Sequence, residues 1–411
     1  MDAARERRNF ALRVSLLFAA ACVISGTQMP YLPVWLDWKG LSANQIAVVT
    51  ALPMFARVLV TPAIAFAADH AQDHRRFLIG LSWAGVLALL VLAHMTSFWP
   101  IVLLTLFFAL ATSTIMPLTD TVAMTGVRAA GLDYGRMRLW GSLSFIAASF
   151  AGGWVVDRLG AMSAIWLVVA GGLLTVMAAH GLARPIGLGR LKAATTPPRI
   201  KFADAVGLLR SPAFLVFLLA AGSVQSAHAV FYTFGTLHWA AQGLSSAWAG
   251  TLWAIGVAVE IALLAFSGAV VRRIGAVELI ALGGATAVLR WLAMGFDPPL
   301  ALLIPLQVMH GVTFGATHIG AIYFMSKAVP EDHNGTAQAL YASVTAGVAL
   351  GGAMLLAGRL YSAYGGQAYW AMAVLAAVGL GASIVLLRMS RTGAVVQPQS
   401  SASGGYTSAP S

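Results

Sequence analysis

The sequence predicts an all-α integral membrane protein with twelve transmembrane helices, arranged as two pseudo-symmetric six-helix bundles. Composition is the first of three observations behind this fold class. Hydrophobic residues make up 59% of the 411 residues and charged residues only 9%, against roughly 25% charged residues in soluble domains. The second observation is the distribution of basic residues along the chain, and the third is a weak internal repeat.

Twelve apolar segments are each long enough to cross a hydrocarbon core, which takes about 20 residues. They are expected at residues 11–36, 44–68, 77–95, 99–124, 137–157, 162–182, 212–238, 246–270, 277–296, 300–326, 335–360 and 368–388. Strands are not favoured, because an open sheet cannot satisfy its backbone in lipid and the segments lack the alternation of barrel strands. The first segment has a basic start but no convincing cleavage site, which favours a first span over a signal peptide.

The basic residues indicate how these segments are oriented. With the N-terminus inside, eighteen Lys and Arg residues fall in the inner segments and only three, Lys39, Arg158 and Arg359, in the outer ones. This is a strong positive-inside bias. We therefore expect a multi-pass protein of the bacterial inner membrane with both termini in the cytoplasm.

A long stretch rich in Pro, Gly and basic residues divides the chain into two halves. We expect an N-terminal bundle at residues 1–183, a cytoplasmic linker at 184–210, a C-terminal bundle at 211–388 and a disordered cytoplasmic tail at 389–411. The tail is predicted from its Ser-, Gly- and Ala-rich composition.

The two halves share a weak repeat. The segment "GLSANQIA" at Gly40 and the segment "GLSSAWAG" at Gly243 begin alike and are 203 positions apart, and the same offset relates Arg57 to Glu260. Two six-helix repeats with a substrate site between them form a transporter architecture.

Charged residues inside the spans are the first candidates for that site, because a charge at mid-bilayer costs about 2.5–3.5 kcal/mol on insertion scales. They are Arg57, Asp120, Arg138, Glu260 and Arg290, with His228, His310 and His318 as titratable neighbours. Two structural alternatives stay open. Glu260 could simply pair with an arginine, and Asp120 could stabilise the inner end of the fourth span. Imidazole titrates close to physiological pH, which suits a proton relay.

Several function classes are not supported by any motif. The sequence contains no P-loop, no H-E-x-x-H, no G-x-S-x-G and no cluster of metal ligands, and Cys22 is its one cysteine. An ATP-driven pump and a membrane-embedded enzyme are therefore not favoured, and we expect no cofactor and no metal. The net charge of +11 is scattered over short loops, so no nucleic-acid partner is expected.

Two loops carry a resemblance to the major facilitator superfamily. Gly268, Arg272, Arg273 and Gly275 fit its G-x-x-x-D-R-x-G pattern, with Arg272 in place of the acidic residue. The copy in the first half is degraded; it keeps the acid and the closing basic pair. The resemblance implies gating loops at Asp69, Arg75, Arg76, Arg272 and Arg273. The segment "GWVVDRLG" at Gly153 matches the pattern fully but is expected on the outer side.

Two longer segments resemble one branch of that superfamily. "LDYGRMRLWGSLSF", from Leu132, and "LQVMHGVTFGATH", from Leu306, are similar to the 3-phenylpropionate permease branch, a relative of the lactose permease-type oligosaccharide:proton symporters. The similarity extends over essentially the whole chain up to Arg388. It implies a major facilitator fold and a monomeric transporter.

The resemblance to lactose permease also implies site residues. Its substrate-binding acid and arginine, 18 residues apart, match Asp120 and Arg138, and its arginine and histidine, 20 apart, match Arg290 and His310. Its glutamate in the eighth span matches Glu260. The substrate-binding set is therefore Asp120, Arg138, Glu260 and Arg290. The proton-coupling set, Glu260, His310 and His318, consists of titratable groups inside the C-terminal spans.

Two positions depart from the lactose permease pattern. Thr313 replaces the family's proton-carrying acid, and Phe145 replaces the tryptophan that stacks on the sugar. A galactoside substrate is therefore not expected, and any proton coupling must use other residues.

The function expected from the sequence is secondary active transport by alternating access. We expect proton-coupled symport of a small organic solute. The resemblance to the 3-phenylpropionate permease branch favours an aromatic carboxylate such as a phenylpropionate, whose negative charge the embedded arginines could receive. The alternatives are a sugar or nucleoside:proton symporter, then a drug:proton antiporter. The expected partners are this small-molecule substrate, protons and the lipid bilayer.

The predicted topology can be tested with reporter fusions. Fusions at Gly40, Gly160 and Gly243 should report the periplasm, and fusions at His74, Lys192 and Arg273 the cytoplasm, because of the basic-residue bias. A reversed pattern would rule out the twelve-span layout.

Overall fold

The structure is a computed structural model that describes residues 2–182 and 202–392. All regular elements within these two ranges are helices, and no strand occurs there. Each of the twelve predicted segments overlaps at least one helix. The predicted linker residues 184–201 and tail residues 393–411 lie outside the described residues.

The first half contains seven helices, which correspond to the first six predicted segments. They are α1 (Asp2–Trp38), α2 (Ala43–Ala71), α3 (His74–Ala93), α4 (Phe98–Ser113), α5 (Ile115–Ala130), α6 (Tyr134–Leu159) and α7 (Ser163–Gly181). The segment predicted at 99–124 is interrupted at Thr114, between α4 and α5. Pro117 explains the break, because it has no N–H for the carbonyl of Ser113 and its ring crowds the preceding turn.

The second half is more interrupted than the sequence predicts. Its elements are α8 (Phe202–Arg210), α9 (Pro212–Ser226), α10 (Ala229–Ala241), α11 (Ser246–Ala265), α12 (Ser267–Ile274), α13 (Ala276–Met294), α14 (Leu300–His310), η1 (Gly311–Ala316), α15 (Thr317–Ala328), η2 (Glu331–His333), α16 (Asn334–Ala342), η3 (Ser343–Ala349), α17 (Leu350–Tyr364), η4 (Gly365–Gln367) and α18 (Ala368–Arg391). The elements η1 and η3 are π-helical turns inside the tenth and eleventh predicted spans. The C-terminal part of the predicted linker forms α8, and the domain boundaries stay a prediction.

Eleven helical runs in the described residues are long and apolar enough to cross a membrane. The last run, Glu331–Arg391, has 61 residues. As one helix it would be about 90 Å long, roughly three times the thickness of a hydrocarbon core. It turns back at η4, where Gly365 has a φ of 56°, and so it supplies both the eleventh and the twelfth predicted spans.

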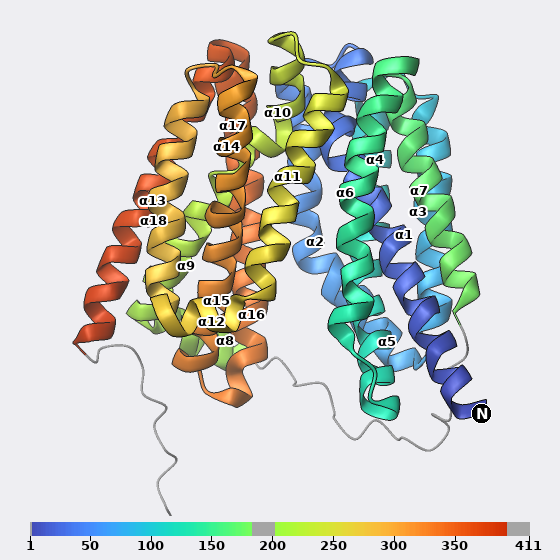
Figure 1. Cartoon of the computed structure of the whole chain (residues 1–411), viewed down its shortest axis with the longest axis horizontal. Coiled ribbons are helices and arrows are strands. Elements are labelled where there is room, and N and C mark those ends of the chain that lie inside the picture. Colours follow the sequence, from blue (N-terminus) through green and yellow to red (C-terminus); the bar gives the residue numbers. More distant parts are fainter. Residues whose placement is uncertain (1, 183–201, 393–411) are drawn as a thin grey trace, which may run out of the picture.

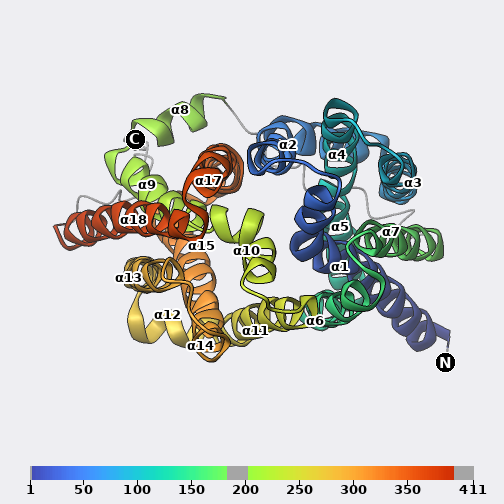
Figure 2. The ribbon, with the colours of Figure 1, turned by 90° about the horizontal axis from the view of Figure 1, so that it is seen from above.

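The helices of the two halves stand side by side (Figures 1 and 2). Across the boundary, α6 packs against α11, α1 against α10, and α2 against α17 and η3. We call the end of the molecule that carries the N-terminus, α8 and α12 the basic end. We call the opposite end, with the α6–α7 and α10–α11 turns, the closed end.

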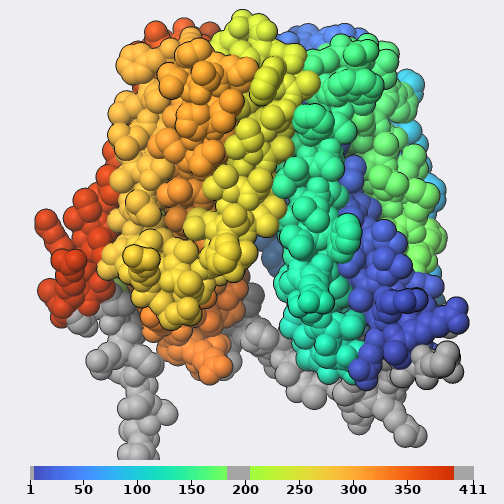
Figure 3. All heavy atoms as spheres, in the orientation of Figure 1, coloured from blue at the N-terminus to red at the C-terminus, as the bar shows by residue number. Residues whose placement is uncertain are grey.

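The bundles touch at the closed end and separate toward the basic end. Gly153 on α6 and Gly250 on α11 have no room for a Cβ, because it would overlap the carbonyl oxygen of Ser246 or of Ser149 across the boundary. The buried Tyr31 hydroxyl donates to the carbonyl of Ser149 beside both glycines. Figure 3 shows a cleft between α6 and α11 that widens toward the basic end.

The apolar core follows the same division. One continuous cluster of buried residues, which includes Tyr31, Trp35, Trp239 and Trp253, joins both bundles. A separate cluster around Leu17 belongs to the first half alone, and other clusters belong to the second half alone. The hydrophobic contact between the halves is therefore concentrated in the shared cluster.

Candidate functional site

Arg290 on α13 is fully buried, and its guanidinium is held by neutral acceptors. Its Nη1 donates to His310 Nδ1 at 3.2 Å and to Thr313 Oγ1 at 3.4 Å, and its Nη2 donates to Gln307 Oε1 at 3.0 Å. Because His310 accepts through Nδ1, its ring is neutral and carries its proton on Nε2. The structure thus brings together Arg290 and His310, which the 20-residue spacing singled out.

Aromatic rings enclose the same guanidinium. Its carbon lies 4.2 Å from the ring centre of Trp291 and 4.9 Å from that of Phe231. Such cation–π contacts strengthen when water is excluded. No ion pair with a carboxylate reaches Arg290 among the described residues, and its Nε has no hydrogen-bond partner there. Its positive charge is therefore not neutralised by an acid of the described chain.

Thr313 lies at the centre of this network, at the position where the related permease has an acid. Its hydroxyl oxygen accepts from Arg290 and lies 3.0 Å from His228 Nε2. His228 Nδ1 lies 3.1 Å from the carbonyl oxygen of Gln225. The one hydroxyl proton of Thr313 has two acceptors, the carbonyl oxygen of His310 at 3.1 Å and, where His228 is neutral and donates through Nδ1, the Nε2 of His228. Thr313 therefore links His228 to Arg290.

The π turn η1 changes the geometry of the tenth span. In a regular α-helix, His310 and His318 would be rotated by about 80° relative to each other. Here Phe314 stacks on both, with ring centres 5.8 Å from His310 and 6.0 Å from His318. A π turn contains an extra residue, as often occurs at functional sites, and it aligns the three rings in one column.

Glu260 lies half-buried on α11, packed against Gly315 of η1. Within the described part of the chain, its carboxylate has neither a hydrogen bond nor an ion pair. The positive charge of Arg138 on α6 attracts this carboxylate across the boundary between the bundles. The negative charge of Glu260 in turn acts on the hydroxyl of Tyr232. Glu260 and Arg138 belong to the two helices that border the cleft of Figure 3.

Asp120 and Arg138 do not form an ion pair in the described structure, although their 18-residue spacing suggested a pair. Asp120 Oδ1 instead accepts from the hydroxyl of Tyr134 at 2.9 Å. Arg138 lies over Phe18, 5.3 Å from its ring centre, and its Nη1 is 3.9 Å from Cys22 Sγ. The arginine is close enough to act electrostatically on Asp120, but a tyrosine holds the carboxylate.

Tyr134 and Gln307 contact site residues but were not predicted as part of the site. Tyr134 stands inside the quoted segment "LDYGRMRLWGSLSF", and Gln307 inside "LQVMHGVTFGATH". Tyr134 lies four residues before Arg138, and Gln307 lies three residues before His310. Helical spacing could therefore have identified both polar side chains.

Arg57, which was predicted as an embedded charge, donates across the boundary to the carbonyl of Ala346 in η3.

The predicted gating residues bind within their own halves. Asp69 Oδ1 lies 2.7 Å from His74 Nε2, and Arg75 donates to the carbonyls of Leu182 at 2.9 Å and His180 at 3.0 Å. Arg76 pairs with Asp73 at 3.0 Å. In the second half, Arg272 and Arg273 are exposed at the end of α12. Their gating role stays a prediction.

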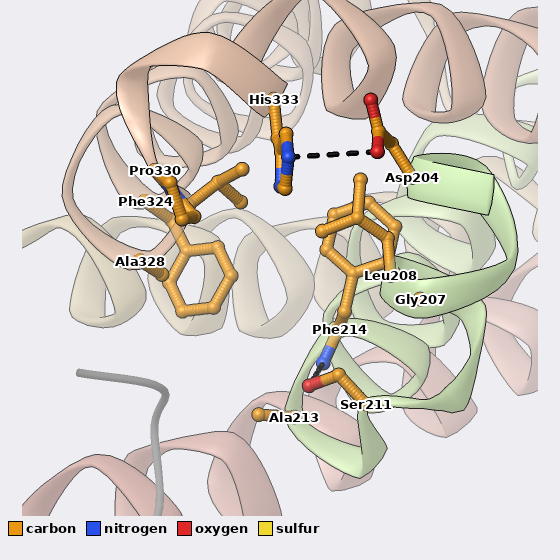
Figure 4. A pocket seen from close by; sticks show the side chains of 11 residues that line it. Asp204, Gly207, Leu208, Ser211, Ala213, Phe214, Phe324, Ala328, Pro330 and His333 are labelled. Carbon is orange, nitrogen blue, oxygen red and sulfur yellow. Dashed lines mark hydrogen bonds and ion pairs between the residues drawn. The ribbon is translucent and has the colours of Figure 1, made fainter. Parts of the chain in front are cut away.

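An apolar pocket at the basic end of the second half is separate from these residues (Figure 4). It lies between α8, α9 and the α15–α16 connection, and Phe214, Phe324 and Pro330 line it. At its edge His333 Nε2 lies 3.6 Å from Asp204 Oδ1. All lining residues come from the second half, so this pocket is not a site between the bundles.

A family model described as "MFS_1 like family" matches residues 11–372. The chain belongs to this family of major facilitator transporters. It is 31% identical over 360 residues to a "Probable 3-phenylpropionic acid transporter" of Escherichia coli (strain K12), a match that covers 85% of this chain and 91% of that protein. It is 29% identical over 404 residues to the maltose permease of Geobacillus stearothermophilus, covering 95% and 97%.

The fold is also similar to solved structures. The crystal structure of the nucleoside transporter NupG superposes with a TM-score of 0.79 at 18% identity, covering 93% of this chain and 99% of that one. The predicted resemblance and the predicted all-α major facilitator fold are confirmed. The protein is a multi-pass secondary transporter for a small molecule, and it is not an enzyme.

The bond between Tyr134 and Asp120 gives a testable prediction. Tyr134→Phe removes one hydrogen bond to a charged acceptor, which is worth about 1.5–3 kcal/mol, so substrate binding should weaken by roughly tenfold if the carboxylate needs this bond. Asp120→Asn should weaken it too, and the double variant should be no worse than the poorer single one. Binding measured on purified protein checks this, and strictly additive losses would show that the two residues act independently.

Proposed function

We propose that the protein is a proton-coupled symporter of a small organic anion, with an aromatic carboxylate as the favoured substrate. One observation carries the proposal. The five charged side chains predicted for the site comprise three arginines, Arg57, Arg138 and Arg290, and two acids, Asp120 and Glu260. A monocarboxylate would neutralise the remaining positive charge, which is expensive to leave unpaired in a membrane.

The rings near the arginines support an aromatic substrate. Phe231 stacks on Trp253 with ring centres 4.5 Å apart, and the half-buried Tyr232 lies 6.0 Å from the same tryptophan. Aromatic rings favour offset or edge contacts with one another, and Tyr232, the partly exposed member of this group, is the ring that a substrate ring could contact, with the buried Phe231 and Trp253 behind it. The first relative is described as a transporter of 3-phenylpropionic acid, which combines a ring with a carboxylate.

Proton coupling is assigned to Glu260. It lies on α11, which borders the cleft, it has no hydrogen bond among the described residues, and Arg138 acts on it electrostatically. When Glu260 binds a proton, the arginines gain a further unit of uncompensated charge, which favours the anion. Proton and anion would therefore bind together. His310 and His318, which both stack on Phe314, are the second candidates for the coupling residue.

Alternating access follows from the same arrangement. The two bundles are in contact at the closed end, and the cleft between them opens toward the basic end (Figure 3). With the basic end in the cytoplasm, as the positive-inside rule predicts, this is an inward-facing state of a monomer in the bacterial inner membrane. The predicted gating loops at the basic end would close it in the opposite state.

A sugar or nucleoside:proton symporter is the second candidate. Two observations favour it: the 29% identity to a maltose permease and the structural similarity to a nucleoside transporter. Gln225, Gln307 and Asp120 could bind hydroxyl groups, because amides and carboxylates both accept hydrogen bonds. A drug:proton antiporter ranks third.

Counterflow in proteoliposomes tests the proposed substrate class. Vesicles loaded with unlabelled 3-phenylpropionate should take up the labelled compound transiently, and vesicles loaded with maltose or a nucleoside should not. Exchange of maltose or a nucleoside alone would transfer the assignment to the second candidate.

The role of the arginines gives a second prediction. Arg138→Lys and Arg290→Lys keep the charge but lose the planar guanidinium fork, so binding of the acid should weaken by roughly ten- to a hundredfold in at least one of them. The primary amide of the same acid serves as the neutral control and should lose less. If both variants bind the acid as tightly as the wild type, the anion assignment is wrong.

Glu260 gives a third prediction. Glu260→Gln is fixed in a neutral form, so substrate exchange should continue while accumulation driven by a proton gradient is lost. Glu278→Gln, at the start of α13, is a matched control that should accumulate normally. Uphill accumulation by Glu260→Gln with a normal response to pH would leave Glu260 a structural role and assign coupling to His310 or His318.

A further inference from the structure

At the closed end, one carboxylate reaches from the first half to the second. Asp157, on the last turn of α6, accepts hydrogen bonds from two backbone amides at the start of α11. Its Oδ1 lies 2.6 Å from the nitrogen of Ser246, and its Oδ2 lies 2.9 Å from the nitrogen of Ala247. Asp157 belongs to the segment "GWVVDRLG", and its neighbour Arg158 lies instead over Trp154 of the same helix.

These two bonds complete the first turn of α11. The first N–H groups of a helix have no partner within it. Ser245, the residue that caps α11, accepts only the amide of Trp248, at 3.3 Å. The amides of Ser246 and Ala247 are left to Asp157, and a negative charge at this end of a helix is favourable. The start of α11 is therefore fully capped only while α6 lies beside it.

The repeat-related helix α2 does not depend on the other half in this way. Ser42 and Gln45 form a capping box in which each side chain accepts from the other's backbone amide, at 3.4 Å and 2.9 Å. Its contact with α17 includes the close approach of Gly358 to Ala47. Of the two repeat-related contacts at the closed end, only the α6–α11 contact includes a carboxylate bond in the described structure.

The backbone approach explains how so short a side chain can bridge two bundles. Gly153 lies one helical turn before Asp157, and it packs directly on Ser246, whose amide Asp157 binds. Gly250 lies one turn into α11 and packs on Ser149. The carboxylate reaches its two donors only when both glycines are in contact, so the bonds form and break together with the closed end.

We propose that Asp157 is a latch that holds the closed end shut, so that its loss shifts the protein toward a conformation in which this end is open. The latch requires only the contact between α6 and α11, and it is independent of the identity of the substrate and of the coupling residue.

The test measures the opening of the closed end without substrate. Spin labels are attached at Ser97 and Gln367, which are exposed in turns of the two halves at this end. The full chain carries Cys22→Ser and is placed in lipid nanodiscs. Double electron–electron resonance then gives the distances. Asp157→Ala and Asp157→Asn should each raise the ratio of open to closed populations by about tenfold, the size of effect expected of one charged helix cap.

Matched variants separate the latch from other effects. Asp157→Asn keeps the side-chain volume, so it reports on the bonds even if the alanine variant folds poorly, and Asp157→Glu should show a smaller shift because it keeps the carboxylate. Asp37→Asn removes another exposed acid at the end of α1 and should leave the distances unchanged. Unchanged distances in both Asp157→Asn and Asp157→Ala, or an equal shift in Asp37→Asn, would overturn the proposal.

Discussion

A lipid bilayer offers no hydrogen-bond partners, and this constraint determines where the helices can be interrupted. The breaks at Thr114 and at Ala227 and His228, and the π turn η1, lie within packed parts of the bundles, whereas η3 includes the exposed Val348. At the second of these breaks the ring of His228 lies within hydrogen-bonding distance of the carbonyls of Val224 and Gln225. The same ring contacts Thr313. A residue that satisfies an interrupted backbone is thus also part of the network around Arg290.

The sequence predicts the helices well because hydropathy and length are local properties. The resemblance to lactose permease also pairs Arg290 with His310 through their 20-residue spacing, and the two side chains are hydrogen-bonded. The π turns were not predicted, because a turn such as Gly311–Ala316 leaves the hydropathy of its span unchanged. The partner of Asp120 was missed for a different reason: spacing identifies helix positions that can meet, but the choice between Arg138 and Tyr134 depends on side-chain packing.

The charged site and the closed end share two helices. Arg138 and Asp157 both lie on α6, and Asp157 comes 19 positions after Arg138, which corresponds to about 28 Å of helix. Glu260 lies on α11, the helix whose first turn contacts Asp157. The helices α6 and α11 therefore connect the charged site with the closed end. A tilt of one helix against the other changes the distances between the bundles at both places at once. This mechanical link needs no chain of side-chain contacts between them.

The excess of embedded arginines has a consequence for ion permeation. A water-filled cleft that opens on one side of a membrane shortens the barrier that inorganic cations must cross. Fixed positive charge raises that barrier again, as an arginine does in water channels that exclude protons and other cations. Arg57 and Arg290 are hydrogen-bonded to groups without a negative charge, so their field persists when no substrate is bound. We expect this field to oppose leakage of sodium ions through the open half of the empty carrier.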